Sequence, residues 1–93
     1  MNVKKIHSKD VKKNNIYYIY ERFTTTRDHL LLKIKALGNG DFIPLEVTIG
    51  NKNHYKNAIR NGLKYSFYFD EYVYIIENPT KEGIEKLALA LLL

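Results

Sequence analysis

The sequence predicts a small, mainly β (α+β) domain of five antiparallel strands with two helices. Residues 63–76, LKYSFYFDEYVYII, hold six of the twelve aromatic rings, and aromatic and β-branched residues are typical of strands. Residues 30–37 alternate between apolar side chains and a second set that includes two lysines, which is the period of a strand. Residues 79–93 place apolar side chains at helical spacing.

Length and charge limit the classes of protein. Ninety-three residues suit a single domain, 1–93, divided into a basic lead-in (1–15), a β-rich core (16–78) and a C-terminal helix (79–93). The absence of cysteine excludes disulfides and thiolate metal sites. A net charge of +5 favours polyanionic partners.

We expect no membrane partner, because no apolar run approaches the roughly twenty residues that span a bilayer. A cytoplasmic location is expected, because the absence of cysteine fits a reducing compartment. The abundance of Lys, Asn, Ile and Tyr is typical of AT-rich genomes, such as those of phages, archaeal viruses and low-GC microbes. The expected location thus includes the interior of an infected microbial host.

Three strands come first, at residues 16–23, 30–37 and 42–49. Gly38-Asn39-Gly40-Asp41 predicts a hairpin between the second and third, because these residue types tolerate positive φ. Pro44 has no N–H for a ladder hydrogen bond, so the third strand is an edge or is bulged there. Strict alternation predicts inward side chains at Ile43, Leu45, Val47 and Ile49 and outward ones at Phe42, Pro44, Glu46 and Thr48.

A short helix is predicted at residues 52–61, with Asn61-Gly62 as its stop. Its basic side chains Lys52, Lys56 and Arg60 are spaced i, i+4 and i+8, so they share one face. Lys64 follows directly, and no acid occurs between Glu46 and Asp70.

The stretch 63–76 has two interpretations: a hairpin that turns at Asp70-Glu71, or one long strand bent there. Either way Tyr65, Phe67 and Phe69 share the parity of the core, and Tyr68 lies on the opposite face. The positions of Tyr72 and Tyr74 depend on the turn. Asn78 and Pro79 then suit the N-cap and first position of the last helix, whose apolar end covers an open barrel end or forms a homodimer contact.

The element order matches that of the OB fold, a five-stranded barrel with a helix between strands three and four. An SH3-like barrel, or an antiparallel sheet backed by two helices, explains the same pattern. A fold of this kind does not by itself indicate a function.

Catalytic and cofactor motifs are not evident. His7, His29 and His54 have no metal-binding spacing, and no P-loop or dinucleotide fingerprint occurs. Asp41 and Glu46 are spaced as in some metal-dependent nucleases, but Thr48 stands where a lysine is needed, and Asp70 begins a second acidic pair. We therefore expect a protein that is not an enzyme and has no cofactor or metal, with a metal-dependent nuclease as the open alternative.

Basic residues interleaved with aromatic ones predict binding of nucleic acid, single-stranded DNA or RNA, because a positive groove follows phosphates while rings stack bases. The predicted binding residues are Lys33, Lys35, Phe42, Lys52, Lys56, Arg60, Lys64 and Tyr68. The alternative is an accessory or inhibitor protein that binds a larger protein or forms a homodimer. It would use the tyrosine-rich strand and the apolar C-terminal tail.

Overall fold

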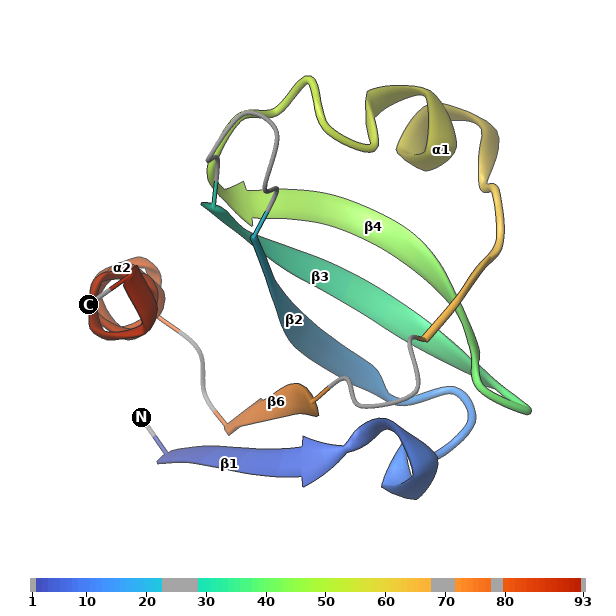
Figure 1. The fold of residues 1–93 in the computed structure, drawn as a ribbon, viewed down its shortest axis with the longest axis horizontal. Helices are drawn as coiled ribbons and strands as arrows, with labels where there is room; N and C mark the ends of the chain where they lie inside the picture. Colours follow the sequence, from blue (N-terminus) through green and yellow to red (C-terminus); the bar gives the residue numbers. More distant parts are fainter. Residues whose placement is uncertain (1, 23–28, 68–71, 78–79, 93) are drawn as a thin grey trace.

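The computed structural model describes residues 2–22, 29–67, 72–77 and 80–92. Within them the chain forms six strands, two α-helices and one 3-10 helix (Figure 1). The elements in order are β1 Asn2–His7, η1 Ser8–Asp10, β2 Ile16–Arg22, β3 His29–Gly38, β4 Asp41–Ile49, α1 Lys56–Asn61, β5 Tyr65–Ser66, β6 Tyr72–Glu77 and α2 Lys81–Leu92. The mainly β class, with one internal and one C-terminal helix, is confirmed.

The strands form one antiparallel sheet in the order β1-β6-β2-β3-β4-β5. Because β1 and β5 are its two edges, the sheet is open (Figure 1). The expected five-stranded OB-like or SH3-like barrel is therefore wrong in its closure and its strand count, whereas the antiparallel sheet is correct.

The extra strand is β1, which lies in the segment expected to be a basic lead-in. β1 pairs along its whole length with β6, from Asn2↔Glu77 to His7↔Tyr72. Ile6 packs against the main hydrophobic core, so this segment is part of the sheet. Its partner comes from the other end of the sequence, and local patterning carries no signal for such a pairing.

The aromatic stretch 63–76 forms two separate strands. β5 pairs with β4 through Asp41↔Ser66 and Phe42↔Tyr65, whereas β6 lies between β1 and β2. Since β5 and β6 are not neighbours in the sheet, neither the hairpin nor the single bent strand is correct. The expected turn at Asp70-Glu71, Phe69 and the predicted binding residue Tyr68 lie outside the described residues.

Each face of the sheet carries its own cluster of buried side chains. The inner face is the one that packs Tyr17, Ile19, Leu30, Leu32, Ile34, Ala36, Phe42, Val47 and Val73 together, with Ile59 of α1 against them. The outer face is the opposite one, where Tyr18, Leu31 and Tyr74 pack against Ile84 of α2. The two helices thus lie against different faces.

Two bulges in β4 explain why strict alternation fails there. Pro44 pairs with Ile34 and Glu46 with Lys33, so Leu45 is an extra residue that shifts the parity of the strand. Phe42 and Pro44 consequently face inward and are buried. The bulge expected from Pro44 is confirmed, and the expected outward position of Phe42 is wrong.

Both helices begin later than the sequence suggests. α1 starts after Tyr55, whose φ is +60°, and ends at Gly62, whose φ is +61°. Lys52 therefore lies in the turns that precede α1, where His54 N–H donates to the Asn51 carbonyl at 3.1 Å. α2 is capped by Thr80, whose hydroxyl accepts from Gly83 N–H at 3.0 Å, and the expected cap Asn78 lies outside the described residues.

Neither α1 nor α2, as far as the structure describes them, has the length and apolar character of a membrane-spanning helix.

Candidate functional site

The predicted binding residues do not form one surface. Lys33 and Lys35 lie on the outer face, opposite Tyr18 and Ile16 of β2. Lys52, Lys56 and Arg60 lie together at α1, on the side of the inner face. The sheet separates the two groups, so a single groove that joins them is not formed.

Phe42 takes no part in either group. Its side chain is 2% exposed, and its ring packs against Phe67 at 4.8 Å and Tyr65 at 6.1 Å between centroids. A buried ring has no free face for a base, so Phe42 contributes to the core rather than to a binding surface.

Lys33 belongs to a row of side chains that crosses five strands of the outer face. The register of the sheet aligns Lys5, Tyr74, Tyr18, Lys33 and Glu46 in that order. Tyr18 and Tyr74 are buried beside α2, and burial raises the pKa of both hydroxyls, helped by Glu46 for Tyr18 and by Tyr20 for Tyr74. α2 therefore covers the tyrosines of the row, and the lysines emerge at two separate places.

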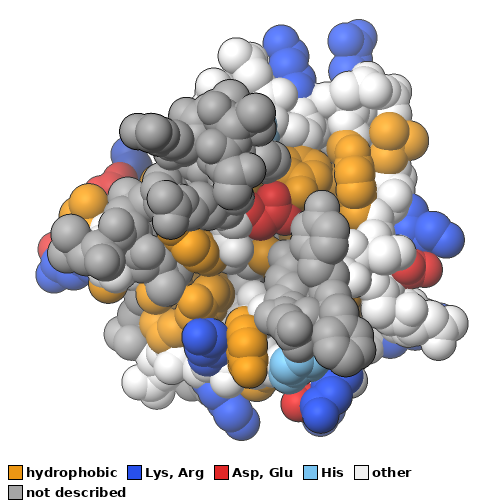
Figure 2. Space-filling view, in the orientation of Figure 1, with side chains coloured by type: hydrophobic (Ala, Val, Ile, Leu, Met, Phe, Trp, Pro, Cys, Tyr) orange, Lys and Arg blue, Asp and Glu red, His pale blue; other side chains and the backbone are white. Residues whose placement is uncertain are grey.

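At α1, three cations surround a hollow of about 300 Å³ between the helix and β4. Its lining consists of Lys52, Lys56, Arg60, Val47 and Ile59, and we call this site the basic hollow. Val47 and Ile59 belong to the inner-face core or pack on it, so they give the hollow an apolar floor. The three basic side chains are exposed. In the space-filling view, Lys and Arg side chains project from the edge of the molecule (Figure 2).

The positive charge of the basic hollow is not compensated within the part of the chain that the structure describes. The ion pairs found there, Lys64 with Asp41 and Lys86 with Glu82, involve none of its cations. Lys64, the fourth predicted cation, is thus partly neutralised at 3.5 Å by Asp41. The first turn of α1 contains no acidic residue.

A hydrogen bond between the sheet and Tyr55 fixes the start of α1. The Tyr55 hydroxyl lies 2.8 and 2.7 Å from the two carboxylate oxygens of Glu21 on β2. Burial raises the pKa of Glu21, while the Tyr55 hydrogen bond and the charge of His54 act in the opposite direction. A left-handed backbone such as that of Tyr55 costs on the order of 1–3 kcal/mol outside glycine, so the surrounding contacts must hold it.

Tyr65 is an exposed ring beside α1 that the sequence pattern assigned to the core. It is 40% exposed and contacts Tyr55 edge-on, at 5.3 Å between ring centroids. Its register places it on the inner face opposite Phe42, but β5 is a two-residue strand at the edge of the sheet, so the ring stays partly exposed.

A second group of cationic and aromatic side chains lies on the outer face, where β1 meets β6. Lys5 Nζ is 4.6 Å from the centre of the Tyr72 ring, and His7 contacts the same ring edge-on at 5.3 Å. We call Lys5, His7 and Tyr72 the β1–β6 patch. Sequence reasoning placed Lys5 in a lead-in and left Tyr72 open, because only the β1–β6 pairing brings them together.

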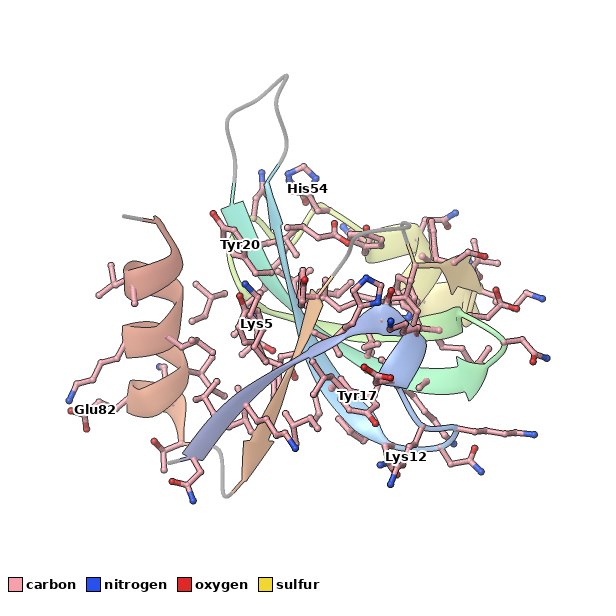
Figure 3. All side chains as sticks on the ribbon, turned by 60° about the horizontal axis from the view of Figure 1, so that its bottom comes forward. Lys5, Lys12, Tyr17, Tyr20, His54 and Glu82 are labelled. Carbon is pink, nitrogen blue, oxygen red and sulfur yellow. The ribbon has the colours of Figure 1, made fainter. Side chains whose placement is uncertain are left out.

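The two sites lie on different sides of the sheet. Figure 3 shows Lys5 and Tyr20 on the side next to α2, whereas Tyr17 and Lys12 lie away from it. In the same view, strands of the sheet lie between Lys5 and α1. The basic hollow and the β1–β6 patch are therefore independent surfaces.

The acidic residues considered for a nuclease are not gathered. Asp41 accepts a hydrogen bond from the Ser66 hydroxyl at 2.8 Å and pairs with Lys64, whereas Glu46 is opposite Lys33 on the outer face. Asp70 is outside the described residues. Across the described ranges, no group of three or more histidine or acidic side chains is arranged to hold a metal ion.

Comparison with protein-family models, with curated proteins and with solved structures gives no match.

Proposed function

We propose that this protein binds single-stranded nucleic acid, with the basic hollow as the site for its phosphates. The observation that carries the proposal is the convergence of Lys52, Lys56 and Arg60 on one hollow, with no ion pair to any described carboxylate. Basic groups of this kind bind phosphodiesters and release counterions.

The floor and the neighbouring ring suit the rest of a nucleotide. Val47 and Ile59 offer apolar contact, and the exposed Tyr65 lies beside α1 through its contact with Tyr55. Base–aromatic stacking contributes about 1–3 kcal/mol per base and tolerates any sequence. An apolar surface next to three cations therefore favours single strands, whose bases are accessible, over a duplex.

Fluorescence anisotropy with labelled single-stranded DNA and RNA at 50 and 200 mM salt tests the proposal. Affinity should fall with salt, and Lys56→Glu/Arg60→Glu should reduce the slope of log K against log salt by roughly 1.4 in magnitude. The matched control is Lys12→Glu/Lys86→Glu, an equal charge change at two exposed sites away from the hollow. Tyr65→Leu should weaken binding and Tyr65→Phe should retain it.

Three outcomes would reject the proposal: no binding at low salt, binding that ignores salt, or equal losses in the double variant and in its control. Equal losses would mean that net charge, and not the basic hollow, determines the affinity.

A second candidate function is docking on a larger protein or on a second copy of the chain. It is favoured by Leu89 of α2, which is 61% exposed and lies within the apolar C-terminal half of the helix. Light scattering over a concentration series would show an oligomer that Leu89→Glu dissociates. A monomer at all concentrations would remove the self-association part of this candidate.

A further inference from the structure

The β1–β6 patch presents a well-positioned aromatic ring. Tyr72 is 46% exposed at the start of β6, whereas Val73 and Tyr74 are buried and Ile75 and Ile76 are half-buried. Two side chains of β1 hold the ring: His7 contacts it with the two ring planes nearly perpendicular, and Lys5 Nζ lies over it. A ring fixed in this way loses little conformational entropy when a ligand stacks on it.

The charge of the patch matches an anionic ligand. Lys5 supplies the positive charge on this face, and the strand from Asn2 to His7 contains no acidic residue. Lys5 extends over one face of the Tyr72 ring from the neighbouring strand, so a cation lies next to the exposed ring. Nucleotides carry both matching groups, a flat base and a phosphate.

We infer that the β1–β6 patch is a second nucleotide contact, in which Tyr72 stacks a base and Lys5 binds a neighbouring phosphate. The protein then holds two segments of nucleic acid on opposite sides of its sheet. This inference rests on the proposed function, because the first segment is the one in the basic hollow. The separation follows from the faces: Val47 and Ile59 belong to the inner face, and Lys5 and Tyr72 to the outer face.

The two contacts can be observed separately by nitrogen-edited NMR, with a 5′-phosphorylated thymidine dinucleotide as the probe. In the wild-type protein, the dinucleotide should shift the amide signals of Lys5 and Val73 at the patch, and those of Lys56 and Arg60 at the hollow. Tyr72→Leu should weaken binding at the patch by about five- to 150-fold, the equivalent of one stacked base. Tyr72→Leu should leave the shifts at the basic hollow unchanged. Tyr72→Phe, which keeps the ring, should bind the dinucleotide at the patch as the wild-type protein does.

Inorganic phosphate serves as the control ligand. Weaker binding of phosphate than of the dinucleotide at the patch supports the stacking role, whereas equal binding would overturn it. No shifts at the patch, or shifts that Tyr72→Leu leaves unchanged, would also overturn the inference. In that case intact binding at the hollow would keep the proposed function.

Energy transfer between a donor-labelled and an acceptor-labelled oligonucleotide distinguishes two strands from one strand that occupies both sites. If the protein bridges two strands, energy transfer appears when the protein is equimolar with the labelled oligonucleotides. The transfer then disappears in both Tyr72→Leu and Lys56→Glu/Arg60→Glu. If one strand occupies both sites, the NMR shifts persist at both without transfer. Shifts at the patch alone would overturn the bridging, because no second contact would exist.

Discussion

The two helices lie against opposite faces of the sheet, and their charges are arranged in opposite ways. α2 buries Ile84 and packs Leu87 against the outer-face cluster, and its exposed Lys86 is paired with Glu82 at 3.3 Å. α1 buries only Ala58 and exposes Lys56 and Arg60, which have no described acidic partner. α2 thus has the composition of a helix that stabilises a fold, whereas α1 leaves its positive charge available to a ligand.

The strongest test of this comparison removes the packing of α2. Ile84 is 6% exposed within the outer-face cluster, so Ile84→Ala should lower the free energy of unfolding by about 2–4 kcal/mol. Leu89→Ala, at an exposed position of the same helix, should change it by less than about 0.5 kcal/mol. Urea denaturation measures both. Equal effects would show that α2 does not use one side to cover the sheet.

The next largest effect concerns the attachment of α1. Tyr55→Phe removes the hydrogen bond to the half-buried Glu21 carboxylate and should cost about 1.5–3 kcal/mol at pH 7. The ring, and with it the contact to Tyr65, is kept. Tyr65→Phe removes an exposed hydroxyl next to the same ring and is the control, with little expected change. A cost for Tyr55→Phe no greater than that of the control would mean that Glu21 does not hold the start of α1.

The same contact predicts a dependence of stability on pH. Burial is the main cause that raises the pKa of Glu21 above its ordinary value of 4.5, so the folded state binds the proton more tightly than the unfolded state does. The stability that the protonated Glu21 contributes is complete below its ordinary pKa. This contribution is lost as the pH rises through the pKa that Glu21 has in the folded protein. The wild-type protein should therefore lose stability relative to Glu21→Gln as the pH rises from below about 4.5 to above the raised pKa. Urea denaturation of both proteins across this range measures the difference, and the opposite slope would contradict a raised pKa.

Local patterns in the sequence predicted the elements whose partners are close in the chain. The β3–β4 hairpin follows from Gly38 to Asp41, where Asn39 and both glycines have positive φ. The helix stop at Gly62 follows for the same reason. In each case a few neighbouring residues determine the backbone, so the sequence pattern is sufficient.

Long-range pairing and the bulges were not accessible in this way. β6 inserts between β1 and β2, and β5 separates from it, because of packing between distant segments that no local period reports. One extra residue at Leu45 was enough to reverse the side on which Phe42 lies. The sequence predicted the three cations of the basic hollow, because the spacing of Lys52, Lys56 and Arg60 is visible in it. It did not predict the apolar floor of the hollow or its separation from Lys33 and Lys35, because both depend on the fold.

The smallest effect is also the most direct comparison of the two helices, because its sign should differ between them. Lys56 and Arg60 are like charges at i and i+4, so Lys56→Gln should raise the free energy of unfolding by roughly 0.2–0.5 kcal/mol. Lys86→Gln removes the i, i+4 pair with Glu82 and should lower it by a similar amount, roughly 0.2–0.5 kcal/mol. Urea denaturation at low salt measures both changes, and both should shrink as salt screens the charges. A gain in stability at Lys56 together with a loss of oligonucleotide affinity would show that α1 keeps its cations at the expense of stability. A loss of stability at both positions would instead assign the cations of α1 the same structural role as those of α2.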